Sequence, residues 1–239
     1  MKYFKSFFIY LLIFSCSSFN NNERIEKIDI ALNLENFAET YLKMNEYFDT
    51  KEIYNSDDFF MFPERKQVIL PNEFKYENKL FNTQKYLDSS YTQGFLVLHE
   101  DSITFESYYL GQNKNTRHIS WSVAKSFISA LMGIAIDEGF IKSIEDNVEK
   151  YLPELSKSGY NGVKIRELLQ MSSGIKFDET YSDINSDINR YWRGFVLGES
   201  QDAFASTLKN KITPGTFNHY VSINTHVLGM IIVKTTGKS

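Results

Sequence analysis

Three serine–lysine pairs in this sequence have a spacing that suits acyl transfer through a serine nucleophile. They are Ser122 with Lys125, Ser173 with Lys176, and Ser206 with Lys209. Residues three apart share one face of a helix, so the lysine amine can reach the serine hydroxyl and take its proton. Because the spacing occurs three times, only the surrounding sequence can show which pair is reactive.

The segment that follows Ser122 provides this context. Apolar residues form a broad stripe from Val123 to Ala135, and Gly139 stands where a helix would end. A serine at a helix start lies beside free backbone N–H groups that can stabilise an oxyanion. We therefore expect a largely buried helix with Ser122 as the nucleophile and Lys125 as its partner. The alternative is an N-cap serine whose lysine extends into solvent.

Structural roles are favoured for the other two pairs. Ser173 precedes Gly174 in an expected turn, and Ser206 lies in an expected surface helix over residues 201–211. No Gly-x-Ser-x-Gly elbow occurs, which argues against an α/β-hydrolase triad. The four histidines lack metal-ligand spacing, so we expect neither a metal nor an organic cofactor.

Composition places the chain among globular proteins. It has 239 residues, of which 42% are hydrophobic and 23% charged, so one domain is the default expectation. The net charge of -4 and the absence of a basic cluster argue against a nucleic-acid partner.

The N-terminus predicts export. Lys2 and Lys5 precede an apolar run over residues 7–14, as in a secretory signal peptide. Cys16 follows in Ile13-Phe14-Ser15-Cys16, which resembles the bacterial lipobox. We therefore expect a lipoprotein-type signal peptide over residues 1–16, a polar tether over 17–31 and a hydrolase domain over 32–239. Lipidated Cys16 would anchor the protein to a membrane of the bacterial cell envelope, facing the periplasm or the exterior. The alternative is a cysteine that merely ends an ordinary signal peptide.

The elements that would position the site follow from the hydrophobic pattern. Residues 94–99 and 103–109 have the composition of two strands, and the turn residues 100–102 between them predict a β-hairpin. Helical spacing predicts a helix from about residue 32 to 48, whereas residues 51–87 look irregular. A second apolar helix is expected over residues 227–233, with Gly237 as its C-cap.

The run from Arg117 to Phe127, continued through Gly139 to Leu155, resembles the β-lactamase-related serine hydrolases. This family includes class C β-lactamases, D-alanyl-D-alanine carboxypeptidases, esterases and aminohexanoate-oligomer amidases, and the Arg-His-x-Ser-Trp-Ser opening is most similar to the last. The segments 168–175 and 214–216 agree. The resemblance implies an α/β (α+β) fold, with a largely antiparallel sheet flanked by helices, a helical subdomain and the active site between them.

The same resemblance implies roles for residues beyond the serine–lysine pair. Tyr220 is similar to the tyrosine of the family's second catalytic element, which would help Lys125 to move the serine proton. Ser222 stands where many β-lactamases have asparagine, a departure that weakens any expectation of antibiotic hydrolysis. Ser222 and Tyr181 would then contribute to substrate binding. The alternatives are a half-buried tyrosine that caps a helix at 220 and a surface aromatic at 181.

The function implied is cleavage of an amide or ester, in a small molecule or a peptide, through an acyl-enzyme. A competing hypothesis is a non-catalytic envelope lipoprotein that keeps the fold and binds peptidoglycan-type peptides. The resemblance also implies a later strand carrying Lys-Thr-Gly or an equivalent. The sequence contains no such strand after Tyr220, so we expect a domain that is incomplete at its C-terminus, with a hairpin at 94–109 that lacks sheet neighbours.

Overall fold

The computed structural model describes residues 23, 25–28, 30 and 36–238, which fall into two compact units. Residues 26–119 form the N-terminal unit, and residues 120–238 form most of the other, which we call the helical unit. The predicted signal peptide, Cys16 and most of the predicted tether lie outside the described residues. Residues 25–28, near the end of that tether, are helical, and Ile28 is buried.

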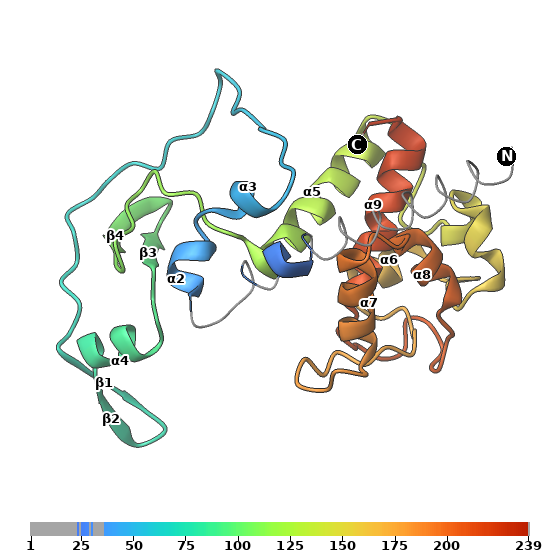
Figure 1. The fold of residues 1–239 in the computed structure, drawn as a ribbon. Coiled ribbons are helices and arrows are strands. Elements are labelled where there is room, and N and C mark those ends of the chain that lie inside the picture. Colours follow the sequence, from blue (N-terminus) through green and yellow to red (C-terminus); the bar gives the residue numbers. More distant parts are fainter. Residues whose placement is uncertain (1–22, 24, 29, 31–35, 239) are drawn as a thin grey trace, which may run out of the picture. The chain divides into compact units, whose positions relative to one another are not determined.

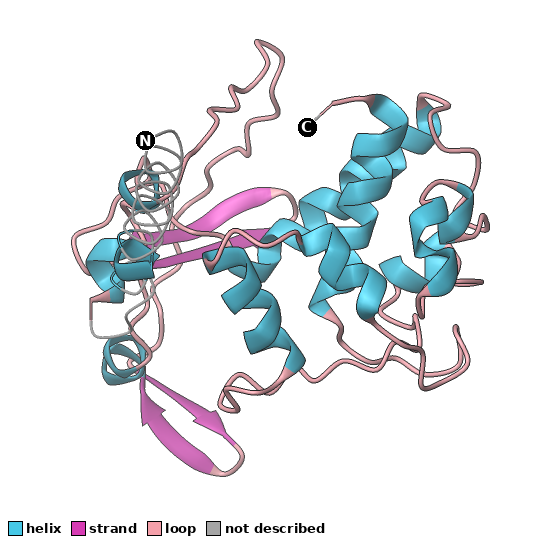
Figure 2. Ribbon diagram, turned by 45° about the vertical axis from the view of Figure 1, so that its right-hand side comes forward, coloured by secondary structure: helices cyan, strands magenta, loops and turns pink. Residues whose placement is uncertain are grey.

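The predicted hairpin is confirmed in the N-terminal unit. Strand β3 (Gly94–His99) pairs with β4 (Ser102–Tyr108) in antiparallel register, and the turn residues Glu100 and Asp101 have φ values of 47° and 54°. The two strands form a sheet of their own, which Figure 2 shows in magenta. On its other side β4 makes one isolated parallel bridge, between Glu64 and Ile103.

A second hairpin lies in the segment that we expected to be irregular. Strands β1 (Glu73–Tyr76) and β2 (Lys79–Asn82) pair antiparallel, and helix α4 (Thr83–Ser89) follows them (Figure 1). The prediction of irregular structure was therefore wrong over residues 73–87. The turn residues Glu77 and Asn78 have positive φ without any glycine, so the usual sequence signal for such a turn is missing.

The helix expected between residues 32 and 48 is broken within its described part. Two single turns take its place, α2 (Phe37–Thr40) and α3 (Met44–Tyr47), and neither has a side-chain N-cap hydrogen bond. Tyr41 lies at the break, where its ring contacts Phe37 and His118 at centroid distances of 5.6 and 6.0 Å. Its carbonyl also accepts a hydrogen bond from the Ile119 N–H. These contacts hold Tyr41 in the turn between the two short helices, which a helical period alone does not predict.

In the helical unit, the single-turn 3-10 helix η1 (Trp121–Val123) leads directly into α5 (Ala124–Asp137), and Gly139 follows with a φ of 80°. The remaining helices in chain order are η2 (Val148–Lys150), η3 (Pro153–Lys157), α6 (Ile165–Leu169), α7 (Asp187–Val196), α8 (Gln201–Thr207) and α9 (Ser222–Thr236). Gly237 caps α9 in the left-handed conformation, as predicted. Helix α8 ends before residue 211 because the following residues pair instead with the loop around Ile175.

Helices α5 and α9 pack against each other in the core of the helical unit (Figure 1). Met132 and Ala135 of α5 are buried there together with Val227 and Ile231 of α9. The prediction that α5 is largely buried was wrong: its apolar stripe is wider than the surface that α9 covers, which leaves exposed Val123, Phe127, Leu131 and Ile134.

The expected fold class is confirmed as a mixture of helices and antiparallel sheets. In the described residues the strands form two separate two-stranded sheets, both in the N-terminal unit, and no helix is long and apolar enough to cross a bilayer.

Candidate active site

Ser122 is the middle residue of η1, at the point where the chain enters α5. Its neighbour Trp121 has a φ of 44°, a strained conformation for a residue with a side chain, and its indole contacts Trp192 of α7 edge to face. Ser122 caps neither helix, because the N-cap residues of η1 and α5 are Ser120 and Val123. Its side chain is exposed, so the geometry does not support the alternative of a capping serine.

Lys125 turns back toward this serine instead of extending into solvent. Its Nζ donates a hydrogen bond to Ser122 Oγ at 3.3 Å, and the same atom lies 5.5 Å from the centroid of the Tyr220 ring. The amine of Lys125 thus contacts both the hydroxyl of Ser122 and the aromatic ring of Tyr220. In its neutral form an amine so placed can accept the serine proton.

Tyr220 lies two residues before the start of α9 and is 43% exposed. The N-cap of α9 is Val221, so Tyr220 does not cap this helix, although a capping tyrosine was the structural alternative. Hydrogen bonds hold the chain on both sides of it. The His219 N–H donates to the Met171 carbonyl at 2.7 Å, and the Ser222 N–H donates to Oε1 of Glu179. The loop before α9 is therefore fixed against residues 171–179.

Tyr181 and Ser222 lie beside Tyr220. Partial burial raises the pKa of the Tyr181 phenol above its ordinary value, and the nearby Glu179 carboxylate and Tyr220 phenol add to this rise. A hydrogen bond with the Ser222 side chain acts in the opposite direction on the same pKa. The structure thus brings the two predicted substrate-binding residues next to the predicted catalytic tyrosine, while Cys16 lies outside the described residues.

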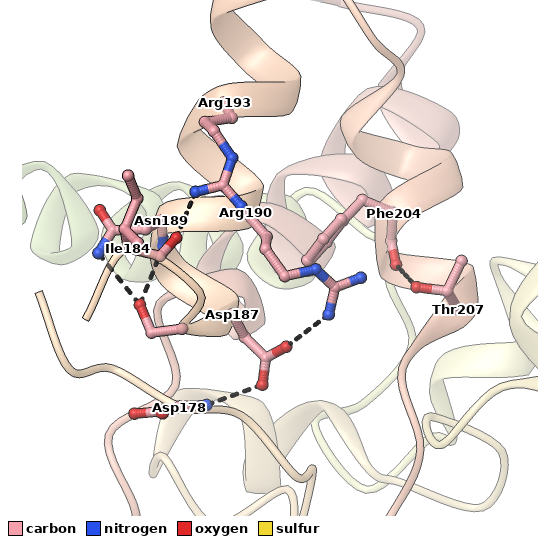
Figure 3. Close-up of polar contacts among 9 residues, drawn as sticks. Asp178, Ile184, Asp187, Asn189, Arg190, Arg193, Phe204 and Thr207 are labelled. Carbon is pink, nitrogen blue, oxygen red and sulfur yellow. Dashed lines mark hydrogen bonds and ion pairs between the residues drawn. The ribbon is translucent and has the colours of Figure 1, made fainter.

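Helix α7 holds the loop that carries Tyr181, as Figure 3 shows in part. Asn189 Nδ2 donates to the carbonyls of Tyr181 and Asp183 at 2.9 and 2.8 Å. Arg193 donates to the Ile184 carbonyl, and Asp187 accepts from the Asp178 N–H at 3.0 Å. Backbone carbonyls along the loop are thereby bound to side chains of one helix.

Buried polar side chains hold α9 through Asn224. Asn224 is completely buried, and its Oδ1 accepts hydrogen bonds from Tyr160 Oη at 3.2 Å and from Ser173 Oγ at 3.0 Å. Ser173 therefore has a structural contact, consistent with its predicted place in a turn. Burial raises the pKa of the Tyr160 phenol well above its ordinary range, so this residue remains a hydrogen-bond donor at neutral pH.

Glu179, Asn189 and Asn224 contribute to the site but could not be predicted from the sequence. Their partners are distant along the chain: Glu179 contacts a residue 43 positions later, and Asn224 a residue 51 positions earlier. No local spacing signals such contacts. Among the described residues, no group of three or more His, Cys, Asp or Glu side chains could hold a metal ion.

The site is thus a serine on a helix start, a lysine one turn later and a tyrosine before a second helix. The Beta-lactamase family profile matches residues 93–239, which is more than half of the sequence. The chain belongs to this family, as the resemblance of its motifs implied.

Two relatives show how far the similarity extends. The 6-aminohexanoate-dimer hydrolase of Paenarthrobacter ureafaciens is 33% identical over 166 residues, which are 66% of this chain and 42% of the relative. The solved structure of a Bacillus anthracis protein assigned as a 6-aminohexanoate-dimer hydrolase superposes with a TM-score of 0.73 at 22% identity, over 87% of this chain and 57% of that one. The second comparison confirms the fold. The chain spans about half the length of these relatives.

Proposed function

We propose that this protein is a serine hydrolase that cleaves an amide or ester through an acyl-enzyme on Ser122. The observation that carries the proposal is the position of Lys125 Nζ, which contacts Ser122 Oγ and lies over the Tyr220 ring. Family membership supports the same chemistry.

The reaction has two halves. Ser122 Oγ attacks the substrate carbonyl carbon as its proton passes to the neutral Lys125 amine, and backbone N–H groups, including that of Ser122, stabilise the oxyanion. The C–N or C–O bond then breaks, and the leaving group takes a proton delivered by Lys125 through Tyr220. Water then attacks the carbonyl carbon of the Ser122 ester as one of its protons passes to the same pair. The bond between that carbon and Ser122 Oγ breaks, Oγ takes the proton back, and the carboxylic acid leaves.

The substrate class that we favour is a small linear amide or ester. Both relatives bear the name of a hydrolase of the 6-aminohexanoate dimer, which is a linear amide. The beta-lactamase family name covers a wider range, but Ser222 stands where many β-lactamases have asparagine. In this proposal Tyr181 and Ser222 border the substrate.

Serine substitutions with a matched control test the proposal. Ser206 has the same spacing to a lysine, but its hydroxyl donates to the Ala203 carbonyl within α8. We expect Ser122→Ala to lower hydrolysis of a nitrophenyl ester and of a linear amide dimer by about 10³-fold or more. Ser206→Ala should leave both rates within about twofold, because Ser206 takes no part in acyl transfer. Near wild-type hydrolysis by Ser122→Ala would exclude the proposed nucleophile, and specific binding of peptidoglycan peptides without any hydrolysis would favour the non-catalytic alternative.

We further propose that Cys16 carries a lipid that holds the protein at a membrane of the cell envelope. The support is the lipobox-like run that ends at Cys16 and the polar residues after it. Expression in a bacterium with labelled palmitate should label the wild type and leave Cys16→Ser unlabelled. Equal labelling of the two proteins, or none of either, would contradict the anchor.

A further inference from the structure

We infer that Glu179 is a positioning residue, whose carboxylate clamps the first turn of α9 and so holds Tyr220 against Lys125. The inference rests on the proposed function, because it assigns Glu179 a part in the same reaction. It starts from a feature of α9: this helix of fifteen residues has no side-chain cap of its own, since its N-cap residue is Val221.

An uncapped helix start leaves backbone N–H groups without intrahelical partners. Glu179 provides the partner from another part of the chain, because its Oε1 accepts the hydrogen bond of the Ser222 N–H across 43 residues. A carboxylate is well suited to this place, since its charge also interacts favourably with the positive end of the helix dipole. The bond is thus a cap supplied by a distant loop.

The clamp acts on Tyr220 because of where it lies. Ser222 is two residues after Tyr220, and His219 directly before Tyr220 is held by two further bonds. Its N–H donates to the Met171 carbonyl at 2.7 Å, and its Nε2 lies 2.9 Å from the Phe177 carbonyl oxygen. Tyr220 is therefore bracketed by contacts to residues 171–179. Without the hydrogen bond to Glu179, the chain would lose the contact that holds it on the C-terminal side of Tyr220.

The loop that carries Glu179 is itself anchored. Asp178, directly before it, donates its N–H to Asp187 of α7 (Figure 3). The Tyr181 carbonyl accepts a hydrogen bond from Asn189 of the same helix. The Glu179 carboxylate also interacts with the Tyr181 phenol, and this interaction helps to raise the pKa of that phenol.

Two conservative substitutions separate the effect of the Glu179 side-chain length from the effect of its charge. Glu179→Gln keeps an oxygen acceptor at the same reach but removes the charge. Glu179→Asp keeps the charge but shortens the side chain by one methylene, so that it no longer reaches the Ser222 N–H. If Glu179 positions Tyr220, the rate at which a fluorophosphonate labels Ser122 should stay within about threefold in Glu179→Gln. In Glu179→Asp and Glu179→Ala it should fall about 10- to 100-fold, the scale expected for a misplaced catalytic group.

A cap elsewhere in the helical unit provides the control. Ser200 caps α8 by accepting from the Ala203 N–H at 3.1 Å. Ser200→Ala should lower the melting temperature without changing the labelling rate. Hydrogen exchange of the Ser222 amide should accelerate in the Asp and Ala variants of Glu179 and stay slow in Glu179→Gln.

The reverse ranking, in which Glu179→Asp retains the rate and Glu179→Gln loses it, would overturn the inference by showing that the charge acts directly. Faster exchange at Ser222 with an unchanged labelling rate would also overturn it, because the clamp would then be structural only. If the fluorophosphonate does not label even the wild type, the proposed function is refuted. Faster exchange of the Ser222 amide in Glu179→Asp and Glu179→Ala than in Glu179→Gln would in that case still support the hydrogen bond from Ser222 to Glu179.

Discussion

At the scale of single residues, the proposal that Ser122 is the nucleophile rests on what surrounds its hydroxyl. Ser173 is 1% exposed and donates to Asn224, whereas Ser206 donates to a carbonyl of its own helix. Only the hydroxyl of Ser122 accepts a hydrogen bond from its paired lysine within the described residues. The same spacing in sequence therefore gives three different environments.

Tyr220 should contribute through its hydroxyl rather than its ring. Tyr220→Phe keeps the ring over which Lys125 lies but removes the group that would pass the proton. We expect the rate of Ser122 acylation by a nitrophenyl ester to fall by about 10²-fold or more, with a melting temperature close to that of the wild type. Stopped-flow release of nitrophenol measures the acylation rate. An unchanged rate would remove Tyr220 from the proton path.

The phenol of Tyr191 should make the free energy of unfolding fall at alkaline pH. Burial, followed by the nearby Asp202 carboxylate, raises the pKa of its phenol to about 12. The unfolded chain loses this proton near pH 10, so the folded state holds one proton more between these values. The contribution of this group to the free energy of unfolding is therefore complete below pH 10 and is lost as the pH rises through about 12.

Urea unfolding of Tyr191→Phe at several pH values tests this expectation. The wild type should lose about 2 kcal/mol more of its free energy of unfolding than the variant between pH 9 and pH 12. Parallel pH profiles for the two proteins would show that the phenol has the same pKa in the folded and unfolded chains.

Part of the site could be predicted from residues alone. Ser122, Lys125 and Tyr220 stand in runs of recognisable sequence, and the structure brings their side chains together. Glu179 could not be found in this way, because its partner is a backbone N–H whose position depends on how two loops fold. Every residue type except proline has a backbone N–H, so a hydrogen bond to the main chain does not require a particular partner residue.

At the scale of elements, the site is held by loops that are bound to helices. The loop from residue 178 to 186 makes several of its backbone hydrogen bonds to side chains of α7. Asn189 takes part in most of these contacts, since its amide lies within hydrogen-bonding distance of three loop carbonyls. The conformation of the loop therefore depends on one half-buried side chain.

Asn189→Ala should loosen this loop while α7 remains intact. Loss of its hydrogen bonds is expected to cost about 1 to 3 kcal/mol in the free energy of unfolding, and hydrogen exchange should accelerate over residues 180–186. The exposed Asn185 on the same loop provides the control, because Asn185→Ala removes none of the side-chain contacts to α7. The same exchange rates in both variants would contradict this account of the loop.

Prediction of elements succeeded where the pattern was local. The hairpin β3–β4, the helical segment of η1 and α5 around the serine, and the C-cap of α9 all follow from short runs of residues. It failed at β1–β2, whose turn has no glycine, and at α2 and α3, where contacts of Tyr41 interrupt the helical period. The exposure of α5 could not be predicted either, since a stripe of apolar residues does not reveal how much of it a neighbour covers.

At the scale of the whole molecule, the helical unit has a core built from many elements. Buried residues from α5, the loops around η2 and η3, α6 and α9 form one continuous cluster. The loops that carry the site pass close to one another, and one of these close contacts involves Gly174. This residue has a φ of 73°, and a Cβ atom added to it would lie 2.0 Å from the Ile212 carbonyl oxygen.

Gly174→Ala should therefore be strongly destabilising. The left-handed backbone alone costs an alanine about 1 to 2 kcal/mol, and the clash with Ile212 adds to this. Gly162 provides a matched control with a φ of 79°, because a Cβ atom there would meet nothing within 4 Å. Thermal unfolding should show a clearly larger loss for Gly174→Ala than for Gly162→Ala. Equal losses of stability in the two variants would mean that the loops around Gly174 and Ile212 can move apart without a cost in free energy.

We propose that Ser122 forms a covalent acyl-enzyme with the help of Lys125. The most direct test is the intact mass of the protein after reaction with a fluorophosphonate, followed by peptide mapping. We expect one adduct per chain, located on Ser122. The adduct should be absent from Ser122→Ala and form much more slowly in Lys125→Ala, while Ser206→Ala should react like the wild type. An adduct on any other residue, or equal labelling of Ser122→Ala, would contradict this proposal.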